Sequence, residues 1–299
     1  MKRKTKFCIL IGIVICIVIT SLLVACDKNI ETKTQTVLYK SANVEVIQTE
    51  DTQEITYVFY EWINLSDKEA YTKNTVLLTG EISNIRYATV SYRFMDCNVI
   101  DNMTLFDVKV DKVLACNSDL FPNREFITVG VGYNTNNYSE DLPEISEGNQ
   151  YLIFCYVAAD IENDVRETSQ YVDCWIGYPK DLLCERIDGY YLVGDFFSDI
   201  PKAINLADST GITEKDVETI MTFDQDDDLG IRNLIKNTMD KSSIKSFFNN
   251  DVAVSSVLRL KERLSNNPNS LWQLINRYYL VEKTVFENYV RVIAESFID

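Results

Sequence analysis

The chain has 299 residues, with 45 Asp and Glu against 29 Lys and Arg, so its formal charge is −16. A chain this acidic repels phosphate backbones, so we expect no nucleic acid partner. The sequence contains no His, which excludes Ser-His-Asp and Cys-His nucleophiles and the HExxH metalloprotease motif. With 46% apolar and 25% charged residues, the composition is typical of a globular protein.

Residues 1–25 have the layout of a cleavable signal peptide. Four cations and no acid lie within Met1–Lys6, and an apolar stretch runs from Phe7 to Ala25. A charged start, an apolar stretch and a small residue before a break in hydrophobicity are typical of export signals. The stretch also has the length of a membrane-spanning helix, so an uncleaved anchor is the alternative. The cleaved signal peptide and the uncleaved anchor both predict that the rest of the chain lies outside the cytoplasm.

The sequence Leu23-Val24-Ala25-Cys26 resembles the lipobox of bacterial lipoproteins. The resemblance implies that the chain is cut before Cys26 and that lipid on the Cys26 sulfur holds it on the extracytoplasmic face of the cell membrane. The membrane is then a partner through this lipid. Cleavage removes four cations and no acid, which changes the formal charge from −16 to −20. Residues 26–42, rich in Thr and Lys, are predicted to be a solvated tether.

Residues 43–198 are predicted to form a β-rich domain with one short helix, which begins at the capping box Ser66-Asp67-Lys68-Glu69. In Leu105–Asp111, apolar residues alternate with charged ones, which predicts one buried and one wet face. Gly80 indicates a bulge or bend. From β-branched and aromatic runs we expect strands at 44–47, 55–63, 76–82, 105–111, 125–132, 150–157, 174–176 and 190–193.

The segments Val76–Ile82, Val108–Leu114 and Glu147–Phe154 resemble OB-like barrels of the netrin and metalloproteinase-inhibitor type, over about residues 72–198. The resemblance implies a small antiparallel OB-like β-barrel. In that family a free N-terminal Cys chelates a protease zinc. The matching residue here is Cys26, to which the lipobox resemblance assigns a lipid. No Cys-x-Cys motif follows it. We therefore expect this chain to share the barrel fold of that family but not its inhibition of metalloproteinases.

Residues 199–299 are predicted to form an α-helical C-terminal domain, so the expected fold class is α+β. Thr213–Asp216 can cap one helix, and apolar spacings of three and four predict helices at 228–239 and 251–264. The strongest pattern is a single C-terminal helix with an apolar stripe from Leu271 to Ile293.

Five cysteines lie in the body of the chain, at 97, 116, 155, 174 and 184. Because their spacing contains no CxxC and the chain has no His, we expect no zinc site. An odd number leaves at least one thiol free or paired outside the chain. A Cys174–Cys184 bridge across a hairpin is one candidate, and burial of the thiols as small apolar groups is the other interpretation.

Three local motifs suggest chemistry but fit it incompletely. Ser242-Ser243-Ile244-Lys245 has the S-x-x-K spelling without the other motifs of penicillin-recognising enzymes, so an exposed helix start is the simpler interpretation. Gly130-Val131-Gly132 lacks the third Gly of a dinucleotide site and is interpreted as a turn. Asp224–Gly230 starts like a calcium loop but lacks its Gly and its bidentate Glu, so acids that complement a helix N-terminus are the alternative. We expect no metal and no cofactor.

These patterns favour a non-enzymatic binding or interaction module whose ligand is an unidentified protein or small molecule. A surface hydrolase with paired carboxylates is one alternative. A solute-binding lipoprotein of a transporter is another, although the alternating βα pattern of such proteins is not visible. Two aromatic groups can line a ligand groove, or else pack in the core as strand aromatics more often do; they are Tyr57, Phe59, Tyr60 and Trp62, and Tyr190, Tyr191, Phe196 and Phe197.

Overall fold

The structure is a computed structural model and describes residues 36–49, 71, 75–132, 145–177, 182–222, 230, 234, 250–262 and 268–298. Contacts divide the chain into Met1–Thr36 and Val37–Asp299, and all strands and helices below belong to the second unit. Within the described ranges, no helix has both the length and the hydropathy that crossing a bilayer requires. Several predicted features lie wholly or mostly outside the described residues, namely Cys26 with its lipobox, the strand at 55–63, Ser66–Glu69, the helix at 228–239, Asp224–Gly230 and Ser242–Lys245.

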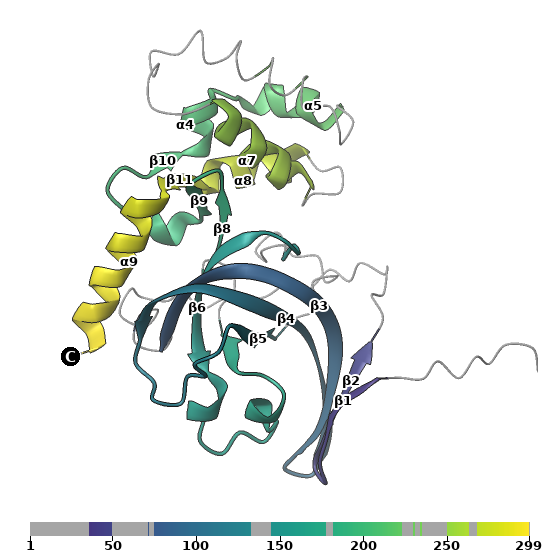
Figure 1. Ribbon diagram of the computed structural model, residues 1–299. Helices are drawn as coiled ribbons and strands as arrows, with labels where there is room; N and C mark the ends of the chain where they lie inside the picture. The colour runs from purple at the N-terminus through teal and green to yellow at the C-terminus, as the bar shows by residue number, and fades with distance from the viewer. Residues whose placement is uncertain are drawn as a thin grey trace, which may run out of the picture. The chain divides into compact units, whose positions relative to one another are not determined.

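The described strands form one eleven-stranded sheet in the order β1-β2-β3-β4-β5-β7-β6-β8-β9-β11-β10 (Figure 1). An additional pairing of β3 with β6 closes β3, β4, β5, β7 and β6 into a ring. The strands are β1 Val37–Lys40, β2 Val44–Thr49, β3 Val76–Phe94, β4 Cys97–Cys116, β5 Phe126–Val131, β6 Gln150–Val157, β7 Cys174–Ile176, β8 Leu183–Ile187, β9 Tyr190–Val193, β10 Ile204–Asn205 and β11 Tyr279–Glu282. Residues 37–40, expected in the tether, are thus the edge strand β1.

The predicted fold class, a small antiparallel OB-like barrel followed by an α-helical C-terminal domain, is wrong. The sheet is larger than such a barrel, and it is mixed, because β5 and β7 run parallel. It also continues into the C-terminal region, where β11 pairs with β9 and Leu280 lies opposite Leu192. A pairing between residues so far apart in the chain leaves no short-range pattern in the sequence.

The two longest strands, β3 and β4, form one curved hairpin that contributes to two cores (Figure 1). Ile82 and Phe106 are buried in the largest core, whereas Val90 and Leu105 are buried in a second core. Neighbouring residues of a strand point to opposite faces, so Leu105 and Phe106 show that β4 is buried on both. In β3 the register shifts between Ser83 and Arg86. This β-bulge reverses the face of the side chains that follow it.

The predicted alternation around Phe106 is confirmed only in part, because Leu105 and Asp107, on the face expected to be wet, are buried and half-buried. Phe106 and Val108 are buried, whereas Lys109 and Asp111 are exposed. The register also shifts next to Gly80, where a Cβ atom would lie 2.5 Å from the carbonyl oxygen of Lys109. Gly80 therefore permits a close approach of two backbones at a bend.

The C-terminal region contains helices α4 (Leu206–Thr210), α5 (Glu214–Thr222), α7 (Asn250–Glu262), α8 (Pro268–Arg277) and α9 (Lys283–Ile298). The predicted single helix from Leu271 to Ile293 is wrong, because β11 separates α8 from α9. Leu271 of α8 and Phe286 of α9 are buried in different cores. The predicted start of α5 is confirmed: Asp216 Oδ2 accepts hydrogen bonds from the Thr213 backbone N–H at 2.8 Å and from its hydroxyl at 2.6 Å.

The described aromatics of the second predicted group pack in the core. Tyr191 and Phe197 are buried, and the Phe197 ring lies 5.0 Å from that of Phe286. Tyr190 and Phe196 are partly buried and pack against the cores, which favours the core-packing interpretation of this group.

No disulfide joins any of the five described cysteines, so Cys174 and Cys184 are not bridged. Both are buried. Cys174 instead interacts with Cys155, whose thiol pKa is raised by the hydrogen bond with Cys174 and by burial.

Candidate functional site

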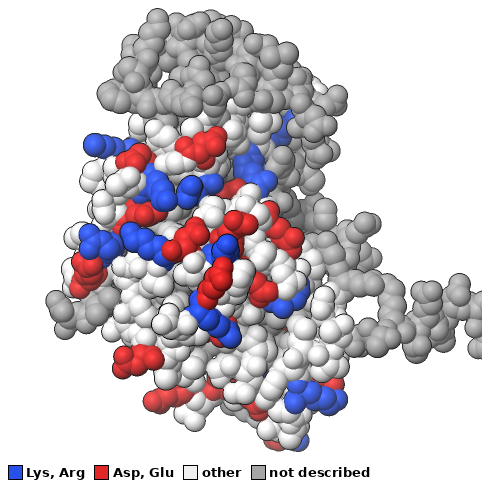
Figure 2. Space-filling view, in the orientation of Figure 1, with Lys and Arg blue, Asp and Glu red and all other residues white. Residues whose placement is uncertain are grey.

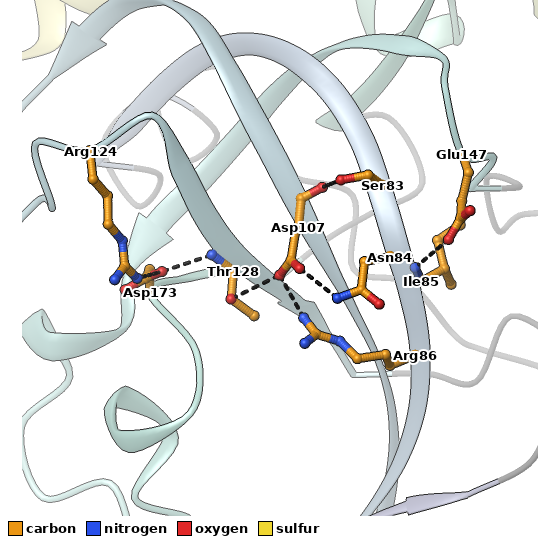
Figure 3. Close-up of polar contacts among 9 residues, drawn as sticks. All are labelled: Ser83, Asn84, Ile85, Arg86, Asp107, Arg124, Thr128, Glu147 and Asp173. Carbon is orange, nitrogen blue, oxygen red and sulfur yellow. Dashed lines mark hydrogen bonds and ion pairs between the residues drawn. The ribbon is translucent and has the colours of Figure 1, made fainter.

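Several polar side chains around the β-bulge form hydrogen bonds with the carboxylate of Asp107 on β4 (Figure 3). Its Oδ1 accepts hydrogen bonds from Arg86 Nη2 at 2.6 Å and from Thr128 Oγ1 at 3.0 Å. Its Oδ2 accepts one from Asn84 Nδ2 at 2.7 Å. Asn84 is the bulge residue with a positive φ of 50°, a conformation that Asn tolerates better than most residues. The Asp107 carboxylate therefore fastens the bulge to β4 and β5.

Asp173 is a second carboxylate in this polar network. It accepts a hydrogen bond from the Thr128 backbone N–H at 2.7 Å and forms an ion pair with Arg124. Thr128 thus connects the carboxylates of Asp107 and Asp173 (Figure 3). Each carboxylate has its own Arg partner, so the network is electrically balanced.

The most buried carboxylate of the described chain is also paired. Glu185 on β8 has a side chain only 5% exposed. Its Oε1 accepts hydrogen bonds from Asn149 Nδ2 at 2.8 Å and from Arg259 Nε at 2.9 Å. Because Arg259 belongs to α7, this pair joins the helix to the sheet.

A general acid needs a carboxyl group with a raised pKa. Two described carboxyl groups have displaced pKa values, and both are lowered. Burial would raise the pKa of Asp164, but hydrogen bonds from Thr168 and Arg166 outweigh it and lower the pKa. Hydrogen bonds from Thr284 lower the pKa of Glu282.

Three partly exposed tyrosines lie at the second core, beside the buried Trp175. We call Tyr39, Tyr92 and Tyr171, with Arg166 and Trp175, the tyrosine surface. The rings of Tyr39 and Tyr171 are 5.8 Å apart, and the Arg166 guanidinium lies 5.2 Å from the centre of the Trp175 ring. A Cβ atom on Gly130 would lie 2.6 Å from that ring. The prediction of a turn at Gly130 is therefore wrong: Gly130 is a residue of β5 that makes room for Trp175.

Two hydroxyl groups of the tyrosine surface donate to carboxylates. Tyr39 donates to Glu167 at 2.5 Å, and this bond raises the pKa of Tyr39. Tyr92 donates to Asp101 at 2.9 Å; its pKa is raised by burial and by this bond. Burial raises the pKa of Tyr171 to about 12. All three phenols are therefore neutral hydrogen-bond donors at physiological pH.

The segment that contributes Arg166 and Tyr171 is acidic. Between Ala158 and Asp173 there are five acids and one cation. On the face of the molecule in Figure 2, cations and acids are interspersed among the described residues and form no extended patch of one sign. The acidic segment is thus a local feature beside the tyrosine surface.

The turn between β3 and β4 exposes apolar side chains. We call residues Phe94–Ile100 the hairpin tip. Phe94 is 47% exposed, Met95 81% and Ile100 67%. Cys97 at the start of β4 is exposed as well. Such a concentration on a protruding turn is typical of a surface that contacts a partner.

The tyrosine surface was not predicted from the sequence, because its residues come from separate parts of the chain and form no motif. Tyr39 and Glu167 are 128 positions apart, and Tyr39 was assigned to the tether. Among the described residues, no group of three or more Cys, Asp or Glu is arranged to hold a metal ion. Cys26, the predicted site of lipid attachment, lies outside the described ranges.

No protein-family model matches this sequence. No curated protein and no solved structure is significantly similar to it.

Proposed function

We propose that this chain is a lipid-anchored, extracytoplasmic binding protein without catalytic activity, and that its tyrosine surface binds a positively charged segment of another protein. The observation that carries the proposal is the set of partly exposed phenols that stand beside carboxylates. Tyr39 with Glu167 and Tyr92 with Asp101 are the two pairs.

The anchor is supported by Leu23-Val24-Ala25-Cys26 and by the charged and apolar residues before it. Two acyl chains on Cys26 hold a protein on a bilayer without any basic patch. This mode of attachment suits a chain with a formal charge of −16, which an anionic membrane surface repels.

A cationic partner is supported by the chemistry of the tyrosine surface. Aromatic faces attract Lys and Arg side chains, and carboxylates pair with them. Tyrosine is also enriched among the residues that dominate protein–protein affinity. The negative charge of the whole chain favours encounter with a cationic partner.

Binding rather than catalysis is supported by the pairing of the enclosed carboxylates. Asp107, Asp173 and Glu185 each have an Arg partner. A hydrolase with paired carboxylates needs one protonated carboxyl group and one free carboxylate, and these three are instead used to join strands and helices.

The binding surface can be tested with a fluorescent oligolysine peptide by anisotropy at low and at physiological ionic strength. We expect Tyr39→Ala and Glu167→Gln each to weaken binding about tenfold, as for residues that dominate an interface. The matched control is Glu295→Gln, which makes the same charge change on the exposed face of α9. Equal effects of Glu167→Gln and Glu295→Gln would mean that the peptide senses only net charge, which contradicts the proposal.

The anchor is tested separately with Cys26→Ser. We expect this variant to accumulate as full-length precursor and to take up no lipid label in cells. Normal cleavage and labelling of the variant would contradict lipidation at Cys26.

A further inference from the structure

We infer that the hairpin tip, residues Phe94–Ile100, inserts into the interfacial layer of the same bilayer that holds the lipid anchor. This inference rests on the proposed lipid anchor, which brings the chain to the membrane. The partner of the hairpin tip is then the lipid bilayer.

Exposure of apolar groups is concentrated at the hairpin tip. Three of the nine exposed large apolar side chains of the described residues, Phe94, Met95 and Ile100, lie within seven consecutive positions. Register places Phe94 opposite Cys97 and Ser91 opposite Ile100, so apolar groups occupy both faces of the hairpin end. A turn that is apolar on both faces suits immersion in a layer better than docking on a flat protein surface.

The charged groups near the hairpin tip can remain at the level of the lipid headgroups. Arg93 is 65% exposed and lies 3.7 Å from Asp96, which it can neutralise. Lys40, in the edge strand β1, is also exposed. Long cationic side chains keep their charge in the headgroup layer while their stems lie against apolar groups.

The length of the tether fits this placement. Register runs from Val37 through Ile47 to Thr89, so the start of β1 is about six residues, or ~20 Å, from Met95 along the sheet. Eleven peptide units connect Cys26 to Val37. A flexible segment of that length has an average reach of ~18 Å, and at most ~39 Å. The anchor and the hairpin tip can therefore contact one membrane at the same time.

Two native cysteines at opposite ends of β4 allow a direct test. Cys97 and Cys116 are exposed, whereas the other three described cysteines are buried. The environment-sensitive fluorophore nitrobenzoxadiazole is attached to Cys97 in a Cys116→Ser chain, and to Cys116 in a Cys97→Ser chain as the matched control. Each mature lipidated protein is reconstituted into phosphatidylcholine vesicles.

We expect a blue shift, a several-fold rise in emission and quenching by spin-labelled lipid at Cys97 alone. Met95→Asp should reduce all three signals. Unchanged emission at Cys97 would overturn the inference, and so would equal changes at Cys97 and Cys116, which indicate nonspecific adsorption.

A further experiment distinguishes the absence of lipid on Cys26 from the absence of membrane insertion by the hairpin tip. A chain that begins at Asp27 and carries an N-terminal hexahistidine tag can be held on vesicles by nickel-chelating lipid, which replaces the lipid on Cys26. The compact unit from Val37 to Asp299 is intact in this chain. A Cys97 signal in the tagged chain supports insertion even if Cys26 carries no lipid, and its absence overturns insertion even if Cys26 is lipidated.

Discussion

Arg86 Nη2 lies 2.6 Å from Asp107 Oδ1 across the β-bulge at which the β3–β4 hairpin changes its buried face. Without the bulge, Arg86 would point into the largest core and the side chains after it would lose their places in the second core. The ion pair therefore holds the register on which the tyrosine surface and the direction of the hairpin tip depend.

Asp107→Ala should destabilise the protein by about 1.5–3 kcal/mol, because it removes hydrogen bonds to a charged group and leaves Arg86 without its carboxylate. Urea unfolding measures the change. The control is Asp96→Ala at the hairpin tip, where the ion pair with Arg93 is exposed and its loss should leave the free energy of unfolding unchanged. Similar losses in the two variants would mean that the network does not hold the bulge.

Gly80→Ala should destabilise the protein by about 1–3 kcal/mol, because its Cβ would lie 2.5 Å from the Lys109 carbonyl oxygen and the two strands would have to separate. At Gly132 the nearest atom, in the Trp175 ring, would be 3.4 Å away. Gly132→Ala should therefore change stability by less than about 1 kcal/mol. Thermal unfolding of both variants checks the difference, and a reversed order would contradict the described bend.

Local features were predictable where the signal lies within a few residues. Gly80 marked the bend, Thr213 and Asp216 marked the start of α5, and the alternation around Phe106 marked the buried face. The pairing of β9 with β11 was missed, because Tyr279–Glu282 continues the helical spacing of its neighbours and only the distant edge of β9 makes it a strand.

The tyrosine surface and the Asp107 network were missed for a related reason. Asp107 was expected on a wet face, but its side chain is only 24% exposed, and its partner Arg86 is brought to it by a bulge that depends on strand pairing. A register shift inverts every later side chain, and nothing in the sequence around Ser83 indicates one. The Tyr39–Glu167 bond likewise depends on the placement of an edge strand.

Stability should fall between about pH 10 and 12, and Tyr171 should cause part of this fall. Its pKa is about 12 in the folded state against about 10 when unfolded, so the folded state retains the proton more tightly. The contribution is complete below pH 10 and is lost as the pH rises through 12. Because the Tyr171 ring is partly exposed, we expect its contribution to the free energy of unfolding to be about 1–2 kcal/mol. Tyr171→Phe should show a shallower fall in urea unfolding across this range; an identical slope would contradict the assignment.

Phe286→Ala should cost about 3–5 kcal/mol, because this buried ring packs against both Phe197 and Tyr191. Trp175 lies in the second core and Trp272 packs against the core of the C-terminal helices. Because the cores belong to one compact unit, Val37–Asp299, the loss should appear equally in fluorescence from Trp175 and from Trp272, each observed alone in Trp→Phe backgrounds. Unfolding of one tryptophan environment without the other would contradict cooperative unfolding of this unit.

The central claim is that Cys26 carries lipid and begins the mature chain. Mass spectrometry of the N-terminal peptide of protein purified from membranes tests it most directly. We predict a peptide that starts at Cys26 and carries the mass of a diacylglyceryl group. A peptide that starts at Met1, or one that begins at or after Cys26 without lipid, would contradict the claim.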